Sequence, residues 1–297
     1  MMLEKLETEK RNQTTMNLDE LSAIDILEKM NAEDENAVNA VKAELKEIEK
    51  AVQLTIHSFK NGGRLIYVGA GTSGRLGILD AVECVPTFST PQDMVQGLIA
   101  GGMKAFTEAV EGAEDSIEAG QNDLKEIKLT EKDTVIGIAA SGRTPYVIGA
   151  LKYANTVEAH TVSISCNKEA KMSQYADVVI EQDTGREVLT GSTRLKAGTA
   201  QKMVLNMIST TAMVGIGKVY QNLMVDLKPT NQKLEERSKN IIMEATDADY
   251  ETASRFYKRS DHQVKLAIIM ILLDCSKEEA IQKIGSSDGF VRKALSK

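Results

Sequence analysis

The 297-residue sequence predicts an α/β protein built on a three-layer, doubly wound, five-stranded parallel sheet, with helices before the sheet and a small helical subdomain after it. Two observations support this prediction. In the middle of the chain, short apolar runs alternate with segments of helical periodicity, which is typical of parallel strands joined by right-handed crossovers. On both sides of that region the patterns indicate helices alone. We therefore expect three parts, at 1–60, 61–225 and 232–297.

The part before the sheet is predicted to be helical. We expect residues 1 to about 18 to be loosely ordered. From Glu35 to Lys60 the apolar residues recur at intervals of three or four, which indicates a helix with one apolar face. These residues are Val38, Val41, Leu45, Ile48, Val52, Ile56 and Phe59. Asn61-Gly62-Gly63 then ends the helix. The apolar face could pack on the sheet or on a second subunit, and the sequence leaves both open.

The sheet is predicted from five short apolar runs, at 64–69, 96–100, 134–140, 161–165 and 177–181. Helical patterns separate and follow these runs, at 74–83, at 104–127 with a break near Gly112, at 145–155 and at 168–175. A long helix rich in small residues is expected at about 195–220, and Pro229 marks a boundary after it. Such strands, flanked by helices, place any ligand beyond their carboxyl ends.

The tail at 232–297 is typical of several short helices. Within it "SDHQVKLAI" (260–268) resembles "SDGFVRKAL" (287–295), and each stretch reads as a turn followed by the start of a helix. A duplicated helical hairpin and a coincidence between two helical segments both fit this likeness.

Composition excludes several classes of function. The net charge is −7, so attraction to nucleic acid or to an anionic membrane surface is not expected, and an anionic ligand would need local arginines and lysines. Aromatic residues make up only 4% and Trp is absent, which argues against a stacking surface. The cysteines and histidines lack metal-ligand spacing. No secretory or membrane segment is recognised, so we expect a cytoplasmic protein.

The first candidate site is the loop "GAGTSG" (69–74), which satisfies the G-x-G-x-x-G pattern of dinucleotide-binding proteins. A dinucleotide site would also need an acidic residue at the end of the second strand, and that strand ends "LIAGG". Thr72 and Ser73 instead place hydroxyls at the start of a helix, beside free backbone N–H groups. This arrangement favours a phosphate monoester or sugar hydroxyls over NAD.

Two further segments share the small, hydroxylated character of the first loop. In "AASGRTPY" (139–146), Thr144 fits an N-cap and Pro145 the first helical position, so that Ser141, Gly142 and Thr144 could surround an anion near Arg143. An ordinary capped helix explains this loop equally well. The segment 184–202 combines Gly, Ser and Thr with basic residues before the long helix, which indicates a ligand-lining segment. Its candidate ligands are Ser192, Thr193, Arg194 and Lys196.

Most of the acidic residues must lie on the surface, so only two regions are candidates for catalysis. Glu83 lies among apolar residues at the end of the helix that begins in the first loop, and Pro86 is expected to stop that helix. A carboxyl group in such surroundings could have the raised pKa that a general acid needs. In "VEGAEDS" and just after it, Glu111, Glu114, Asp115 and Glu118 cannot be ranked from the sequence.

Taken together, these motifs resemble a known family. The hydroxyl-rich loops and the strand pattern are similar to the sugar isomerase (SIS) domain, a phosphosugar-binding fold. "GREVLTGSTRLKAGTAQK" resembles a signature shared by bacterial N-acetylmuramic acid 6-phosphate etherases and the animal glucokinase regulatory protein. The chain length, "GAGTSGRLG", "DAVECVPTF" and "GAEDS" resemble the etherases in particular. One departure is Arg186, where the family usually has Pro or Ala.

The resemblance implies a carbon–oxygen lyase that acts without a cofactor, as a homodimer, on N-acetylmuramic acid 6-phosphate. It places the catalytic carboxylates at Glu83, as the acid on the ether oxygen, and at Glu114, as its partner. The implied substrate ligands are Gly71, Thr72, Ser73, Arg75, Ser141, Gly142, Thr144, Ser192, Thr193, Arg194 and Lys196. A phosphosugar isomerase and a non-catalytic phosphosugar sensor are the two alternatives on the same fold.

Overall fold

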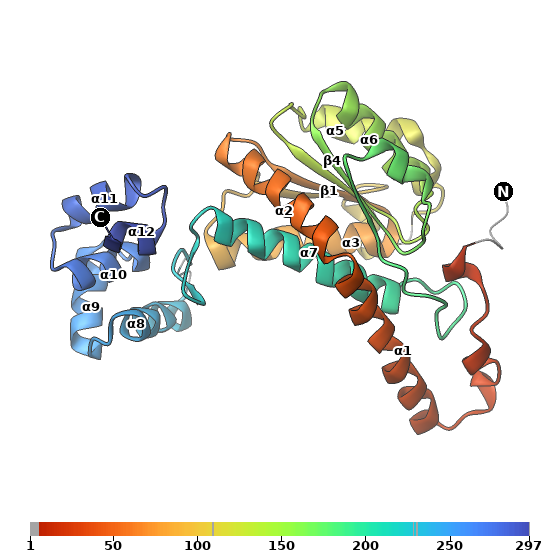
Figure 1. The fold of residues 1–297 in the computed structure, drawn as a ribbon, viewed down its shortest axis with the longest axis horizontal. Coiled ribbons are helices and arrows are strands. Elements are labelled where there is room, and N and C mark those ends of the chain that lie inside the picture. The colour runs from red at the N-terminus through yellow and green to blue at the C-terminus, as the bar shows by residue number, and fades with distance from the viewer. Residues whose placement is uncertain (1–5, 109, 228, 230, 297) are drawn as a thin grey trace. The chain divides into compact units, whose positions relative to one another are not determined.

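The computed structural model describes residues 6–108, 110–227, 229 and 231–296, which form two compact units (Figure 1). The first unit contains the described residues of Met1–Val82 and Asp93–Ser209. The second contains the described residues of Glu83–Gln92 and Thr210–Lys297. Each unit has its own buried core, and each is described separately below.

The first unit is built around a parallel sheet, and all five predicted strands are confirmed. They are β1 (Leu65–Gly69), β2 (Val95–Ile99), β3 (Thr134–Ile138), β4 (His160–Ser165) and β5 (Val178–Glu181). Their order in the sheet is β2-β1-β3-β4-β5, and each neighbouring pair is parallel. The central strand β3 and its neighbour β1 are buried along their whole length, because helices cover both faces of the sheet.

Successive side chains of a strand point to opposite faces of the sheet, so each face has its own set of core residues. Ile66 and Val68 of β1 pack in one cluster with Leu124 of α5 (Ile117–Glu126) and Tyr146 of α6 (Pro145–Thr156). Tyr67 points to the other face, where its hydroxyl donates to Asp80 of α3 (Gly71–Phe88) at 2.8 Å. On that face Figure 1 also shows α2 (Leu45–Lys60) and α7 (Lys196–Gly215). The predicted three-layer, doubly wound fold is therefore confirmed.

Asp80 holds α3 and α7 together beside β1. Besides the Tyr67 hydroxyl, its carboxylate accepts hydrogen bonds from Asn206 Nδ2 at 2.7 Å and from Ser209 Oγ at 3.1 Å. Burial raises the pKa of Asp80, and these three hydrogen bonds oppose that rise by favouring the ionised form. The part of α7 around Asn206 and Ser209 thus has a defined position against the helix that begins in the GAGTSG loop.

Several helix ends differ from the prediction. The stripe over 35–60 belongs to two helices, α1 (Ala23–Ala43) and α2, and α1 begins at the N-cap Ser22, well before the stripe. Pro86 was expected to stop α3 but lies inside it, since the helix continues for two more residues, to Phe88. The segment 168–175 contains only a 3-10 turn, Lys171–Tyr175.

The region 104–127 is more divided than the one predicted break near Gly112. It contains the short α4 (Lys104–Thr107), a 3-10 turn at Ala113–Asp115 and α5. Gly112 has φ +72, a left-handed conformation that glycine adopts without strain. It therefore separates α4 from the 3-10 turn at Ala113–Asp115. The long helix α7 ends at Gly215, five residues before the predicted limit of about 220.

Residues 1 to about 18 were expected to be loosely ordered, and this is wrong for the described part, which begins at residue 6; residues 1–5 lie outside the described residues. The segment forms three 3-10 turns, Glu7–Glu9, Gln13–Thr15 and Leu18–Glu20. Thr8 is buried and its hydroxyl accepts from Asn167 Nδ2 at 3.0 Å. Thr15 Oγ1 donates to the carbonyl of Val188 at 2.9 Å, so the segment is fastened to the first unit at two points.

The second unit contains the predicted short helices, α8 (Gln232–Thr246), α9 (Tyr250–Arg259), α10 (Val264–Leu273), α11 (Lys277–Gly285) and α12 (Val291–Ser296). The likeness between the two tail stretches is structural. Asp261 and His262 before α10 both have positive φ, as do Asp288 and Gly289 before α12. Each pair follows a buried serine and precedes a buried valine, so the same turn and helix start occur twice. This favours the duplicated helical hairpin.

Candidate active site

The strand order determines where a ligand is expected in the first unit. In a sheet ordered 2-1-3-4-5, the connections after β1 and β3 lead to opposite faces, which leaves a crevice between the carboxyl ends of these two strands. The loops that follow β1 and β3 are the GAGTSG loop and the loop 139–144. The two loops selected from the sequence therefore flank the switch point of the sheet.

The hydroxyl groups of the GAGTSG loop lie against α7. Ser73 is buried and its hydroxyl donates to Gln201 Oε1 of α7 at 2.9 Å. Thr72 is half-buried and lies beside α7, because a Cβ built at Gly198 would be 3.4 Å from the Thr72 methyl. Gly71 is exposed with φ +54. The start of α7 is thus part of the surroundings of this loop.

A cavity of about 340 Å³ opens beside this loop, and we call it the switch-point pocket because it borders the GAGTSG loop. Apart from Arg75, its other lining residues follow β2, which pairs with β1 on the side away from β3, and none of them belongs to the loop 139–144. Its chemically active lining consists of Gly71, Arg75, Glu108, Glu111 and Glu114. The Arg75 guanidinium donates to the carbonyls of Ala105 at 2.8 Å, Phe106 at 2.9 Å and Glu108 at 3.3 Å, which holds the segment after α4 against α3. The pocket therefore brings together a fixed cation and several carboxylates.

This pocket ranks the four acidic residues that the sequence could not separate. Glu111 and Glu114 line it, whereas Asp115 and Glu118 are absent from its lining. Glu114 is exposed at the 3-10 turn that follows Gly112. Glu83 is also exposed and belongs to the second unit, in the last part of α3.

The loop after β3 packs tightly at its glycine. Gly142 has φ +65, and a Cβ at this position would lie 2.3 Å from Cβ of Ala170. Ser141 Oγ accepts from the Arg143 N–H at 3.3 Å, while Thr144 precedes α6 without capping it and Pro145 occupies its first turn as predicted. In the described part of the chain, the buried Nε of Arg143 has no hydrogen-bond partner. A buried, unsatisfied guanidinium nitrogen is a suitable donor to an anion.

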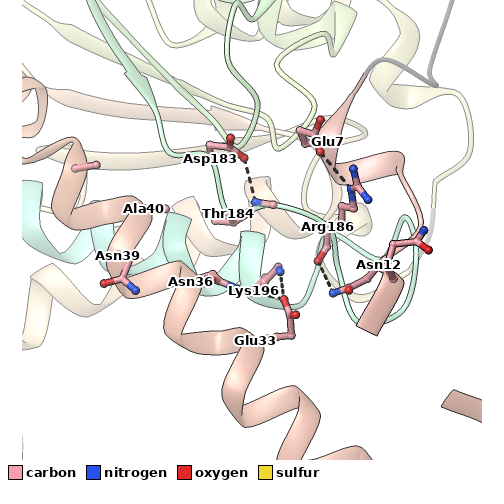
Figure 2. A pocket seen from close by; sticks show the side chains of 13 residues that line it. Glu7, Asn12, Glu33, Asn36, Asn39, Ala40, Asp183, Thr184, Arg186 and Lys196 are labelled. Carbon is pink, nitrogen blue, oxygen red and sulfur yellow. Dashed lines mark hydrogen bonds and ion pairs between the residues drawn. The ribbon is translucent and has the colours of Figure 1, made fainter. Parts of the chain in front are cut away.

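The candidate ligands at and just before the start of α7 differ in how exposed they are to solvent. Ser192 and Thr193 are half-buried and Arg194 is exposed. Lys196 is buried and its ammonium donates to Glu33 Oε2 of α1 at 2.5 Å. Figure 2 shows this pair in a second cavity, of about 590 Å³, together with Asp183, Thr184 and Arg186. The structure therefore places Gly71, Arg75 and Glu114 in one pocket and Lys196 in another.

Among the described residues, no group of three or more His, Cys, Asp or Glu side chains could hold a metal ion. None of the helices in that part of the chain combines the length and the apolar character that crossing a bilayer requires. The groups around the GAGTSG loop and the loop 139–144 are carboxylates, hydroxyls, backbone N–H groups and arginines.

Comparison with known proteins agrees with this geometry. The family model of the glucokinase regulatory protein N-terminal SIS domain matches residues 47–155, and that of the SIS domain matches residues 116–211. N-acetylmuramic acid 6-phosphate etherase of Shouchella clausii is 66% identical over 296 residues, with 100% of both chains covered. The etherases of Bacillus cytotoxicus and Bacillus mycoides are 67% and 65% identical, over 99% of this chain and 100% of theirs. This chain belongs to the N-acetylmuramic acid 6-phosphate etherase family. The resemblance inferred from the motifs is confirmed.

In this member of the etherase family, sequence reasoning missed the residues that hold the site loops in place. Gln201 fixes Ser73, and Asn167 donates to the carbonyl of Ala140, in the second loop, at 2.9 Å. Glu187 is completely buried and accepts hydrogen bonds from the backbone at the start of α7. The etherase-like signature contains Glu187 and Gln201, but nothing in their spacing distinguishes them from its other polar residues.

Proposed function

We propose that this chain cleaves the D-lactyl ether of N-acetylmuramic acid 6-phosphate by elimination followed by addition of water, and that it serves in the recycling of cell-wall sugars. The products are N-acetylglucosamine 6-phosphate and D-lactate. The observation that carries the proposal is the identity of about two thirds, over the full chain, with proteins named for this activity. The switch-point pocket, with Arg75 beside Glu111 and Glu114, is where we place the substrate.

The reaction needs a proton acceptor and a proton donor, which suits a pair of carboxyl groups. In the open-chain sugar, the C2 proton is acidic because it lies next to the C1 aldehyde. A base removes this proton, its electron pair forms the C2=C3 double bond, and the C3–O bond breaks as an acid protonates the departing lactate oxygen. Water then adds at C3 and a proton returns to C2, so the net change consumes one water.

The charge of the substrate explains the basic residues around the loops. The phosphate carries about −1.5 to −2 at neutral pH and the lactyl carboxylate adds −1, which is about −3 in total. A protein of net charge −7 must therefore concentrate cations locally. Arg75 and Arg143 lie next to the two loops of the switch point, and the buried Arg143 Nε is available to an anion. We assign the phosphate to these loops.

The proposed substrate ligands are the small, hydroxylated and basic residues of the three segments, namely Gly71, Thr72, Ser73, Arg75, Ser141, Gly142, Thr144, Ser192, Thr193, Arg194 and Lys196. Glu83 is proposed as the acid that protonates the ether oxygen. Glu114 is proposed as the group that acts on the C2 proton or on the water.

Substitution of the two glutamates tests this assignment. Glu114→Gln and Glu83→Gln should fold normally and lose roughly 10²- to 10⁴-fold in turnover, since a positioned acid or base is worth about that much. Glu118→Gln is the matched control, because Glu118 is exposed in the same region but does not line the pocket. Glu111→Gln tests the other glutamate of the pocket. Lactate release near the wild-type rate from both the Glu83 and Glu114 variants would disprove the assignment.

An isotope experiment distinguishes the proposed reaction from its alternatives. The protein is incubated with N-acetylmuramic acid 6-phosphate in heavy-oxygen water, and both products are analysed by mass spectrometry. Elimination and hydration place the label at C3 of the sugar and none in lactate, whereas attack on the lactyl carbon labels lactate. Formation of a ketose phosphate without lactate would indicate an isomerase, and binding without any product would indicate a sensor.

We also propose that the chain acts in the cytoplasm as a homodimer, without metal or cofactor. Support for a dimer comes from apolar side chains left exposed in the first unit, among them Leu79 and Val82 on α3 and Met103 and Phe106 near α4. Sedimentation at working concentration tests this, and a monomer that retains full turnover would contradict it.

A further inference from the structure

Glu187 combines complete burial with a specific pair of backbone contacts. Its side chain is 0% exposed, and its carboxylate accepts from two consecutive N–H groups, that of Lys196 at 3.2 Å and that of Ala197 at 3.0 Å. These two residues open the 20-residue helix α7. The first N–H groups of a helix have no partner within the helix, and they carry its positive dipole end, so a carboxylate there is well stabilised.

The contact closes a loop of the chain. Residues 188–195 leave Glu187 and return to it at the start of α7, and they carry the proposed substrate ligands Ser192, Thr193 and Arg194. Turns stabilise the loop from inside, with the Ser192 N–H donating to the Leu189 carbonyl and the Gly198 N–H to the Thr193 carbonyl. From outside, Thr15 Oγ1 donates to the Val188 carbonyl at 2.9 Å. The ligands therefore lie on a loop whose two ends are held.

The same contact affects where the phosphate can bind. An unoccupied helix N-terminus would be a ready anion site, but Glu187 already occupies the first two N–H groups of α7. The next N–H, that of Gly198, donates to the Thr193 carbonyl. The start of α7 therefore serves as a support for the loop rather than as a phosphate cradle.

The support extends to the GAGTSG loop. Gln201, in the second turn of α7, accepts from the buried Ser73 hydroxyl, and Gly198 lies against the Thr72 methyl. Displacement of the first turn of α7 would consequently move ligands in both segments. Lys196 takes part twice, because its backbone N–H donates to Glu187 and its buried ammonium donates to Glu33 of α1 (Figure 2).

We propose that Glu187 is a positioning residue of this enzyme, which holds the loop 188–195 and the first turn of α7 in the arrangement that binds the phosphosugar. The proposal rests on the function proposed above. It assigns Glu187 no contact with the substrate and no proton transfer, so it predicts an effect on binding and little effect on the chemical step.

The test compares Glu187→Gln with Asp133→Asn. A glutamine keeps the shape of the side chain, but its amide nitrogen takes the place of one carboxylate oxygen. One of the two backbone N–H groups then faces another donor and loses its hydrogen bond. Asp133 is a matched control: it is 1% exposed and accepts from two backbone N–H groups, those of Arg64 at 2.8 Å and Thr130 at 2.9 Å, at the amino ends of β1 and β3. Both changes remove one buried carboxylate from a pair of backbone donors, but only the first touches a ligand-bearing loop.

We expect Glu187→Gln to raise KM for N-acetylmuramic acid 6-phosphate roughly ten- to hundredfold, because three ligand side chains lose their preorganisation, and to change kcat less than about threefold. Asp133→Asn should leave both constants within about twofold. Hydrogen exchange should show lost protection at the Lys196 and Ala197 amides in Glu187→Gln alone. Equal KM values for Glu187→Gln and the control, or a loss confined to kcat, would overturn the proposal.

Two further measurements distinguish a failure of the proposed role of Glu187 from a failure of the proposed function. If Glu187→Gln does not fold, Thr15→Val loosens the same loop from outside, and an unchanged KM in that variant counts against the proposal. Calorimetric binding of N-acetylglucosamine 6-phosphate to the wild-type protein is the reference. A wild type that neither binds this product nor releases lactate would refute the proposed function itself, whereas an active wild type with unaffected variants refutes only the role of Glu187.

Discussion

The two glycines Gly71 and Gly74 of the GAGTSG loop should respond to alanine in opposite ways, because the structure requires them for different reasons. A Cβ at Gly74 would lie 2.7 Å from the Gly69 carbonyl oxygen and 2.6 Å from Cγ1 of Ile99. A Cβ at Gly71 would have no heavy atom within 4 Å, but the backbone there has φ +54. The first glycine permits a backbone conformation, and the second permits α3 to lie close to β1 and β2.

The magnitudes follow from these contacts. In Gly74→Ala the gain in helix propensity, up to about 1 kcal/mol, is opposed by overpacking against a backbone oxygen that cannot move without shifting β1. Overpacking in a dense interior costs about 1–3 kcal/mol, and we expect a net loss of about 1–2 kcal/mol. In Gly71→Ala the left-handed conformation costs about 1–2 kcal/mol, and the smaller entropy of the unfolded chain returns about 0.4–1 kcal/mol.

Equilibrium unfolding in urea and steady-state lactate release measure the two effects. Gly71→Ala should lose at most about 1.6 kcal/mol of unfolding free energy but should raise KM at least roughly tenfold, since Gly71 lines the switch-point pocket. Gly74→Ala should lose more stability, and its kinetic effect should be the smaller of the two. If Gly71→Ala is the less stable variant and binds substrate normally, the reasoning from the glycine contacts is wrong.

The remaining predictions concern the amino ends of the strands and the N-terminal segment. Burial alone would raise the pKa of Asp133, but hydrogen bonds from Arg64 and Thr130 lower it below the ordinary value. Asp133 therefore stabilises the fold above about pH 4 and loses this contribution as the pH falls through its folded-state pKa, so urea midpoints of Asp133→Asn should depend less on pH between about 2 and 5 than those of the wild type. A parallel pH dependence in both proteins would contradict this. Arg186→Ala removes the half-exposed ion pair with Glu7 and should cost less than about 1 kcal/mol, with faster hydrogen exchange at Thr8 and near-normal turnover. Unchanged exchange would show that Arg186 does not fasten the segment.

The sheet could be predicted from the sequence because buried parallel strands consist of short apolar runs. Strands that are consecutive in the chain also pair with each other, except β2 and β3, which lie on either side of β1. All five strands lie within two residues of the predicted limits. Helix ends were harder, because they depend on tertiary contacts. The N-terminal segment is ordered by bonds such as that between Thr8 and Asn167, 159 positions apart, and no local pattern contains such information.

The candidate site shows the same division between local and distant contacts. Both loops of the switch point were identified because each is a continuous stretch of small and hydroxylated residues after a strand. Glu111 and Glu114 could not be told apart from Asp115 and Glu118, because the backbone of the two turns around Gly112 decides which carboxylates reach the pocket. The contact of Glu187 with the start of α7 could not be predicted from the sequence, for a different reason. A buried carboxylate bound to backbone N–H groups has no characteristic partner residue in the sequence.

The glycine pattern that suggests a dinucleotide follows from packing rather than from the ligand. Gly69 and Gly74 are required because a strand turns at once into a helix that lies against it, and any ligand class can be bound at such a turn. The discriminating position is the end of β2, where a dinucleotide site has a carboxylate for the ribose. Here β2 leads into Gly101 and Gly102, both with positive φ, and the Arg75 guanidinium donates to the carbonyl of Ala105 shortly after them. A cation at the edge of this pocket suits a phosphorylated acidic sugar better than a ribose hydroxyl.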